Sequence, residues 1–229
     1  MAVMQEQARD NTKTRIMNTA EELFAVHGFQ RTTIKHLADE ANVNLAAVNY
    51  HFGSKMGLIK ALLESRLGPT IARQVQQLSE VQKQAQSEGR PPEIREAVEA
   101  FIEPVFEKSR SLPDRNRFMA LEGRAMWEAN AKIRNIFTGL FVQSFTIFYN
   151  TMSLALPEMP KEDLLWRLHY GVGALSHCMR MCSIRLSAQG SPTYKAEITQ
   201  VVDSLVDFIA TGVAGDNLRK KDLEKTMTS

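Results

Sequence analysis

The stretch from Thr32 to Lys55, TTIKHLADEANVNLAAVNYHFGSK, contains two short amphipathic segments separated by residues that suit a turn. From Ile34 onward, apolar residues recur at the i, i+3, i+4, i+7 spacing of one helix face, and Thr33 is placed to cap that helix. We expect the helix to stop at Asn42, because asparagine tolerates the left-handed backbone that ends helices. Asn44 can cap the next segment, so the spacing predicts two helices joined by a tight turn.

Such a helix pair is a helix-turn-helix, a motif that places its second helix in the major groove of DNA. Small alanines on the outer face would let this helix approach the base edges, and Asn49 could pair bidentately with adenine. Nearby cationic and polar side chains would contact phosphates, which fix register rather than sequence. The residues expected to contact DNA are Thr33, Lys35, Asn44, Leu45, Ala46, Ala47, Asn49, Tyr50, His51 and Lys55. By pattern alone, a helical hairpin packed in an ordinary core remains the alternative.

With their neighbours, these residues resemble the DNA-binding region of the tetracycline-repressor (TetR) family of bacterial transcription regulators. The resemblance covers residues 10–66 and rests on a helix over 14–26 ending in His27-Gly28-Phe29, on Thr32-Thr33-Ile34, Leu37-Ala38, Val43 to Phe52, Ser54-Lys55 and Leu58. Asn42 stands where the family usually has glycine, and Asn49 where it usually has tyrosine, which bears on the operator sequence. The run 44–52 is similar to a subgroup that includes fatty-acid-responsive regulators.

Composition places the chain among globular proteins. It has 229 residues, 44% of them hydrophobic and 24% charged, with a net charge of +2. Residues 1–66 hold 8 Lys and Arg against 7 Asp and Glu, a net of +1, so the case for DNA depends on where the basic groups lie. Two cysteines make no disulfide framework, and no secretion signal or long apolar run is apparent, which predicts a cytoplasmic protein without a membrane segment.

Helical periodicity extends along the rest of the chain, and no strand pattern accompanies it. The sequence therefore predicts an all-α fold of nine to ten helices. We expect a mobile tail at 1–8. A connecting helix should begin at Lys55 and carry any ligand signal, with a kink or break at Gly68-Pro69. The glutamine-rich stretch at 74–86 should be exposed. The expected units are a helix-turn-helix domain over 1–54, a helical effector-binding and dimerisation domain over 55–214 and a polar tail over 215–229, with the last helix spanning about 193–213 after a cap at Ser191.

The resemblance implies a homodimer built through the last two long helices. Small residues in the helix expected over 162–187 would let two such helices approach closely across a twofold axis. The alternative is a monomer that uses the same faces internally. The residues expected at the dimer interface are Gly171, Gly173, Ala174, Val202 and Leu205.

The resemblance also implies a cavity for a small-molecule effector in the helical body. Large, flexible and aromatic side chains suit an apolar cavity, although at helical spacing they also suit a plain core. The candidates are Phe118, Met119, Met126, Trp127, Phe137, Phe141, Phe145, His177 and Met181. The similarity to fatty-acid-responsive regulators suggests a long apolar effector such as an acyl chain or its coenzyme A thioester. Arg124 or Arg180 could then meet an acidic headgroup.

An enzyme is the competing class. Cys178 and Cys182 lie at i, i+4 and could hold a soft metal, but no further ligands are evident, so core cysteines are the better interpretation. No phosphate loop, nucleophile elbow or metalloprotease helix is present. We therefore expect no catalytic residue, metal or cofactor. The sequence predicts a ligand-responsive repressor that binds a palindromic operator as a homodimer, with an effector-independent DNA-binding protein as the alternative.

Overall fold

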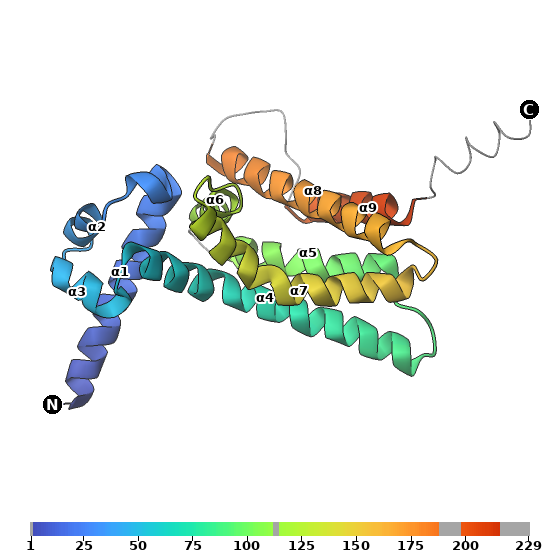
Figure 1. Ribbon diagram of the computed structural model, residues 1–229, viewed down its shortest axis with the longest axis horizontal. Coiled ribbons are helices and arrows are strands. Elements are labelled where there is room, and N and C mark those ends of the chain that lie inside the picture. Colours follow the sequence, from blue (N-terminus) through green and yellow to red (C-terminus); the bar gives the residue numbers. More distant parts are fainter. Residues whose placement is uncertain (1, 112–114, 188–197, 216–229) are drawn as a thin grey trace, which may run out of the picture.

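The computed structural model describes residues 2–111, 115–187 and 198–215, and the side chains within 11–107, 121–182 and 198–215. Over these residues it contains helices and no strands, which confirms the all-α prediction. Figure 1 shows a small group of helices at one end and an elongated helical body beside it. The helices are α1 (Ala2–Arg31), α2 (Ile34–Glu40), α3 (Leu45–Phe52), α4 (Lys55–Ser87), α5 (Ile94–Ser111), α6 (Arg115–Met126), α7 (Ala131–Ala155), α8 (Lys161–Ser187) and α9 (Ile198–Ala214).

The small group, α1 to α3, forms the head. Its core is made of apolar side chains that are fully buried or nearly so, among them Phe24, Phe29, Leu37 and Val48. The helical conformation of α1 is interrupted at Gly28, where φ is 81°, as expected for a glycine that stops a helix. The expectation of a tail over 1–8 was wrong, because α1 begins at Ala2.

Helix α4 connects the head to the body and runs through both (Figure 1). The expected break at Gly68-Pro69 was wrong, since a single helix spans Lys55 to Ser87 with Pro69 inside it. Packing accounts for this result. The buried stripe of α4 continues past the proline through Ile71 and Leu78, and both α5 and α7 pack along it. Burial of that stripe offsets the hydrogen bond that the proline cannot donate.

The same packing overturns a second expectation about α4. The glutamine-rich stretch is not uniformly exposed: Gln74 is only 1% exposed, and Ala85 is buried as well. Composition alone made this stretch look solvated, whereas one of its faces is covered by the helices of the body.

In the body, α4 lies on one side, α8 and α9 lie on the other, and α5 and α7 run between them (Figure 1). Helix α6 sits at the end nearest the head, in contact with α1 as well as with α8. Arg167 of α8 donates to the carbonyl oxygens of Val213 and Gly215 at 2.8 and 2.6 Å, and so caps the end of α9. The expected start of α9 near 193, its cap at Ser191 and most of the expected tail lie outside the described residues. Among the described helices, none is long and apolar enough to traverse a bilayer.

Candidate nucleic-acid interface and ligand cavity

Two side-chain caps and one left-handed residue shape the helix-turn-helix. The hydroxyl oxygen of Thr33 accepts from the backbone N–H of His36 at 3.1 Å, and the Asn44 side chain accepts from the N–H of Ala46 at 2.9 Å. Between them Asn42 adopts a left-handed backbone with φ of 49°. All three features confirm the prediction from sequence. They fix where α2 stops and in which direction α3 starts.

The outer face of α3 is open to solvent. Val48 is 1% exposed and anchors the helix to the head, whereas Tyr50 is 70% exposed. Leu45, Ala46 and Asn49 share the exposed side with Tyr50, while Ala47 and His51 are half-buried. Thr33, Lys35 and Asn44 are also accessible around the same unit. Apart from Lys55, the residues proposed to contact DNA are therefore exposed or half-buried on the helix-turn-helix.

Lys55 is less available than its neighbours. Its ammonium group donates to the carbonyl oxygen of Gln30 at 3.3 Å, and the side chain is half-buried. Partial burial lowers the pKa of Lys55, and the nearby Glu128 carboxylate opposes that shift. The amine thus holds the start of α4 against the end of α1, which reduces its freedom to contact a phosphate.

Two further residues shape the head in roles that were not predicted from the sequence. Thr32 is buried, and its hydroxyl donates to the carbonyl oxygen of Gly28 at 3.0 Å, which closes the turn after α1. At Gly57, an added Cβ would collide with the carbonyl oxygen of Phe52. The glycine therefore permits the close approach of α4 to the end of α3, and no local sequence signal identifies such a tertiary contact.

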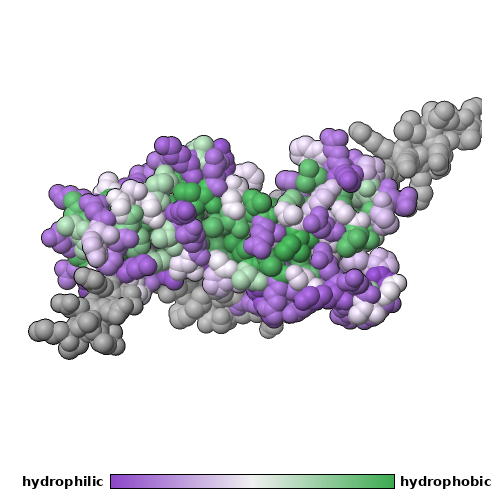
Figure 2. All heavy atoms as spheres, turned by 60° about the horizontal axis from the view of Figure 1, so that its bottom comes forward, coloured by the Kyte–Doolittle hydropathy of each residue, from purple (hydrophilic) through white to green (hydrophobic). Residues whose placement is uncertain are grey.

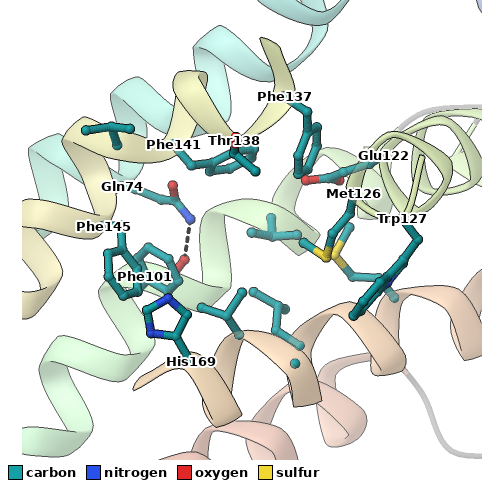
Figure 3. Close-up of a pocket in the computed structure, with 16 residues that line it drawn as sticks. Gln74, Phe101, Glu122, Met126, Trp127, Phe137, Thr138, Phe141, Phe145 and His169 are labelled. Atoms are coloured by element: carbon teal, nitrogen blue, oxygen red, sulfur yellow. Dashed lines mark hydrogen bonds between the residues drawn. The ribbon is translucent and has the colours of Figure 1, made fainter. Parts of the chain in front are cut away.

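The body contains a partly open cavity of about 410 Å³, within the usual range for sites that hold a small organic molecule. It lies among α4, α5, α6, α7 and α8 (Figure 3). Most of its wall is apolar. The lining residues are Gln74, Phe101, Val105, Glu122, Met126, Trp127, Phe137, Thr138, Phe141, Val142, Phe145, His169, Val172, Gly173, Leu175 and Met179.

Five of the nine residues expected at a ligand cavity line it: Met126, Trp127, Phe137, Phe141 and Phe145. His177 and Met181 are not part of the described wall, because they project from other faces of α8. The side chains of Phe118 and Met119 lie outside the described residues. Two polar lining residues, Gln74 and Glu122, were not predicted from the sequence. They are only 1% and 4% exposed, whereas a polar residue in a helical pattern is normally assigned to the surface.

Neither arginine considered for an acidic headgroup lines the cavity. Arg124 instead faces the head, where its guanidinium donates to the carbonyl oxygen of Val26 at 3.2 Å. The side-chain amide of Gln30 donates to the Glu128 carboxylate at 3.3 Å, just beyond the end of α6. Because α6 also contributes Glu122 and Met126 to the cavity wall, one helix contacts both the cavity and the head.

The residues expected at a dimer interface are largely used inside the chain. Val202 and Leu205 are buried by the chain's own helices, and a Cβ at Gly171 would lie 3.0 Å from the Ile209 side chain. Gly173 lines the cavity but is exposed, and Ala174 is half-buried. Among the described side chains, the large apolar residues that α8 and α9 leave exposed are Leu165, Trp166, Tyr170 and Phe208, and Trp166 stacks on Tyr170 with ring centroids 6.1 Å apart. Figure 2 shows that hydrophobic side chains also gather across the middle of one face of the molecule.

The fold and the exposed α3 together define a helix-turn-helix protein with a cavity-bearing helical body. The N-terminal profile described as "Bacterial regulatory proteins, tetR family" matches residues 16–62, and that described as "Tetracyclin repressor-like, C-terminal domain" matches residues 99–212. The chain belongs to the TetR family, as the resemblance implied. This is a family of transcriptional regulators rather than of enzymes.

Individual relatives match over part of their length. The chain is 40% identical over 52 residues to the uncharacterized regulator YvkB of Bacillus subtilis, a match covering 23% of this chain and 28% of YvkB. It is 38% identical over 60 residues to the regulator TtgR of Pseudomonas putida, covering 26% and 28% of the two chains. These matches thus span little more than a quarter of the relatives' length.

Solved structures agree over the whole fold. The fatty acid degradation regulator FadR from Bacillus halodurans superposes with a TM-score of 0.64 at 11% identity, covering 89% of this chain and 99% of FadR. The regulator PfmR from Thermus thermophilus gives a TM-score of 0.58 at 17% identity, covering 86% and 98%. At these identities the likeness establishes the arrangement of the helices only.

Proposed function

We propose that this protein is a ligand-responsive transcriptional regulator that binds a palindromic operator as a homodimer and represses transcription until a small, largely apolar effector releases it. The observation that carries the proposal is the solvent-exposed face of α3, on which Asn49 and Tyr50 are both accessible. Because α3 is capped and anchored by Val48, it presents a rigid reading surface.

The exposed aromatic residues of α8 and α9 support the dimer. Trp166, Tyr170 and Phe208 leave apolar area in water that a second copy would cover. A twofold arrangement through these helices presents two copies of α3, and heads about 34 Å apart match successive major grooves on one side of DNA.

Helix α6 is the proposed route from the cavity to the head. It supplies cavity wall on one side and contacts α1 through Arg124 on the other, so an effector that repositions α6 changes the seating of the head. The two heads then no longer fit successive grooves, and DNA affinity falls. By thermodynamic linkage, operator DNA weakens effector binding by the same factor.

Selection of bound sites from randomised duplex DNA tests the proposal. We expect enrichment of an inverted repeat, and that repeat then serves as the operator in binding titrations with apolar compounds present. An effector lowers operator affinity and raises the melting temperature of the protein by mass action. Acyl chains and their thioesters belong in this screen, since the FadR structure is named for fatty acid degradation. An operator that binds equally well with every compound would instead favour the effector-independent alternative.

A further inference from the structure

The polar groups in the cavity wall differ in whether they accept or donate hydrogen bonds. The amide nitrogen of Gln74 donates to the carbonyl oxygen of Phe101 at 2.6 Å, with the amide oxygen on the other side (Figure 3). That oxygen is buried and has no hydrogen-bond partner among the described residues. A buried acceptor of this kind is costly unless another group satisfies it.

The donors of the other wall residues are directed to protein atoms. The indole N–H of Trp127 donates to the Ser176 hydroxyl at 3.0 Å, and the Thr138 hydroxyl donates to the Arg134 carbonyl at 3.0 Å. The ring Nδ1 of His169 lies 2.8 Å from the Leu165 carbonyl, which can only accept, so Nδ1 carries the proton. In the neutral ring, Nε2 of His169 is then an acceptor as well.

The remaining polar wall group, Glu122, is a carboxyl group that is 4% exposed. No lysine or arginine is found among the described residues that line the cavity. Apart from Glu122, the polar wall groups that remain for a ligand are therefore acceptors, within an apolar surface built from phenylalanine, valine, leucine and methionine side chains.

We propose that the effector carries a hydrogen-bond donor, such as a phenolic hydroxyl, an alcohol or an amine, on an aromatic or aliphatic body, and that this donor binds the Gln74 oxygen. The inference rests on the proposed role of the cavity as the effector site. It disfavours an ionised fatty acid, whose carboxylate only accepts hydrogen bonds and would meet the Gln74 acceptor in a cavity whose described wall lacks a lysine or arginine.

Three probes with one body and different headgroups test the donor: 4-hexylphenol, its methyl ether 4-hexylanisole, and 4-hexylbenzoate. Calorimetric titration of the full-length protein at pH 8 keeps the phenol neutral. We expect the phenol to bind about tenfold more tightly than the ether, the factor that corresponds to one hydrogen bond to a buried acceptor, and the benzoate to bind most weakly.

Gln74→Met removes the acceptor while keeping a chain of similar length, so the phenol and the ether should then bind almost equally. Gln77→Met is the matched control, because Gln77 lies on the same helix with a buried amide oxygen that also has no partner among the described residues, yet it does not line the cavity. This control should keep the tenfold ratio. If Gln74→Met does not fold, the ratio measured on the wild-type protein decides alone.

The donor requirement would be overturned if the wild type bound the phenol and the ether equally, or if Gln74→Met kept the tenfold ratio of their affinities. The cavity would still be a binding site for such compounds in either case. If none of the three probes binds, the inference and the cavity's role as a site for such compounds fall together. Operator binding without ligand, measured separately, shows whether the DNA-binding function stands in either case.

Discussion

At Gly57 the first turn of α4 passes so close to the end of α3 that no Cβ fits beside the Phe52 carbonyl oxygen. Gly57→Ala should destabilise the protein by about 1–3 kcal/mol through overpacking and displace α3. Denaturant unfolding followed by circular dichroism measures the change. Gly139→Ala is the control, because Gly139 lies inside α7, where an added Cβ meets nothing within 4 Å. That variant should gain stability of about 0.5–1 kcal/mol from helix propensity, and equal losses in both would refute the steric argument.

Asn49 is the residue best placed to read a base. It is exposed on α3 and its amide matches the donor and acceptor of adenine. Asn49→Ala should relax base preference at one position per half-site by about 1–3 kcal/mol, measured with a set of operators substituted at each position. Lys35→Ala, also exposed, should weaken all of these operators alike and lower the salt dependence of binding. Unchanged discrimination in Asn49→Ala would remove this residue from the reading surface.

Residues whose roles are local were predictable from the sequence. The caps at Thr33 and Asn44 and the left-handed Asn42 follow from side-chain chemistry within a few positions along the chain. The roles of Gly57, Gln74 and Glu122 depend instead on contacts with other helices that pack against them. Their roles became visible only when the helices were assembled.

At the scale of elements, α6 offers a second connection between the cavity and the head beside α4, the helix that the sequence predicts to carry a ligand signal. Its Arg124 guanidinium donates to the Val26 carbonyl of α1, while Glu122 and Met126 face the cavity. Arg124→Ala should leave effector affinity in the absence of DNA unchanged but reduce the factor by which effector weakens operator binding. That factor is typically about 5–150 for coupled sites.

Operator binding titrated at several effector concentrations measures this factor. Lys132→Ala near the start of α7 is the control, because Lys132 is exposed and its side chain has no described contact with the head. If Arg124→Ala responds to effector as the wild type does, the signal does not depend on this contact.

Element boundaries could be predicted where turn residues mark them, as at Asn42 between α2 and α3. The continuity of α4 could not be predicted, because Pro69 gives a strong local signal for a helix break, and the packing of α5 and α7 against α4 overrides that signal. The cavity lining was predictable for the stripe Phe137, Phe141 and Phe145, which repeats at helical spacing. It was not predictable for α8, where His177 was expected and His169 is found, since several faces of that helix carry large side chains.

At the scale of the whole molecule, the dimer depends on the exposed aromatic residues of α8 and α9. Phe208→Asp introduces a charge where we expect a second copy to pack, and a buried unpaired charge is strongly unfavourable. Sedimentation at micromolar concentration should therefore show a monomer for Phe208→Asp and a dimer for the wild type. Leu154→Asp is the control, since Leu154 is comparably exposed but lies on α7. Two monomeric variants, or two dimeric ones, would contradict the assignment of the interface.

The account depends above all on two copies of the exposed α3 lying in successive major grooves of one DNA molecule. Hydroxyl-radical footprinting of the full-length protein on its selected operator measures this directly. We predict two protected tracts related by twofold symmetry, about one helical turn apart on the same side of the duplex, and their loss in Phe208→Asp at concentrations that saturate the wild type. A single asymmetric tract, or protection that does not depend on dimerisation, would contradict it.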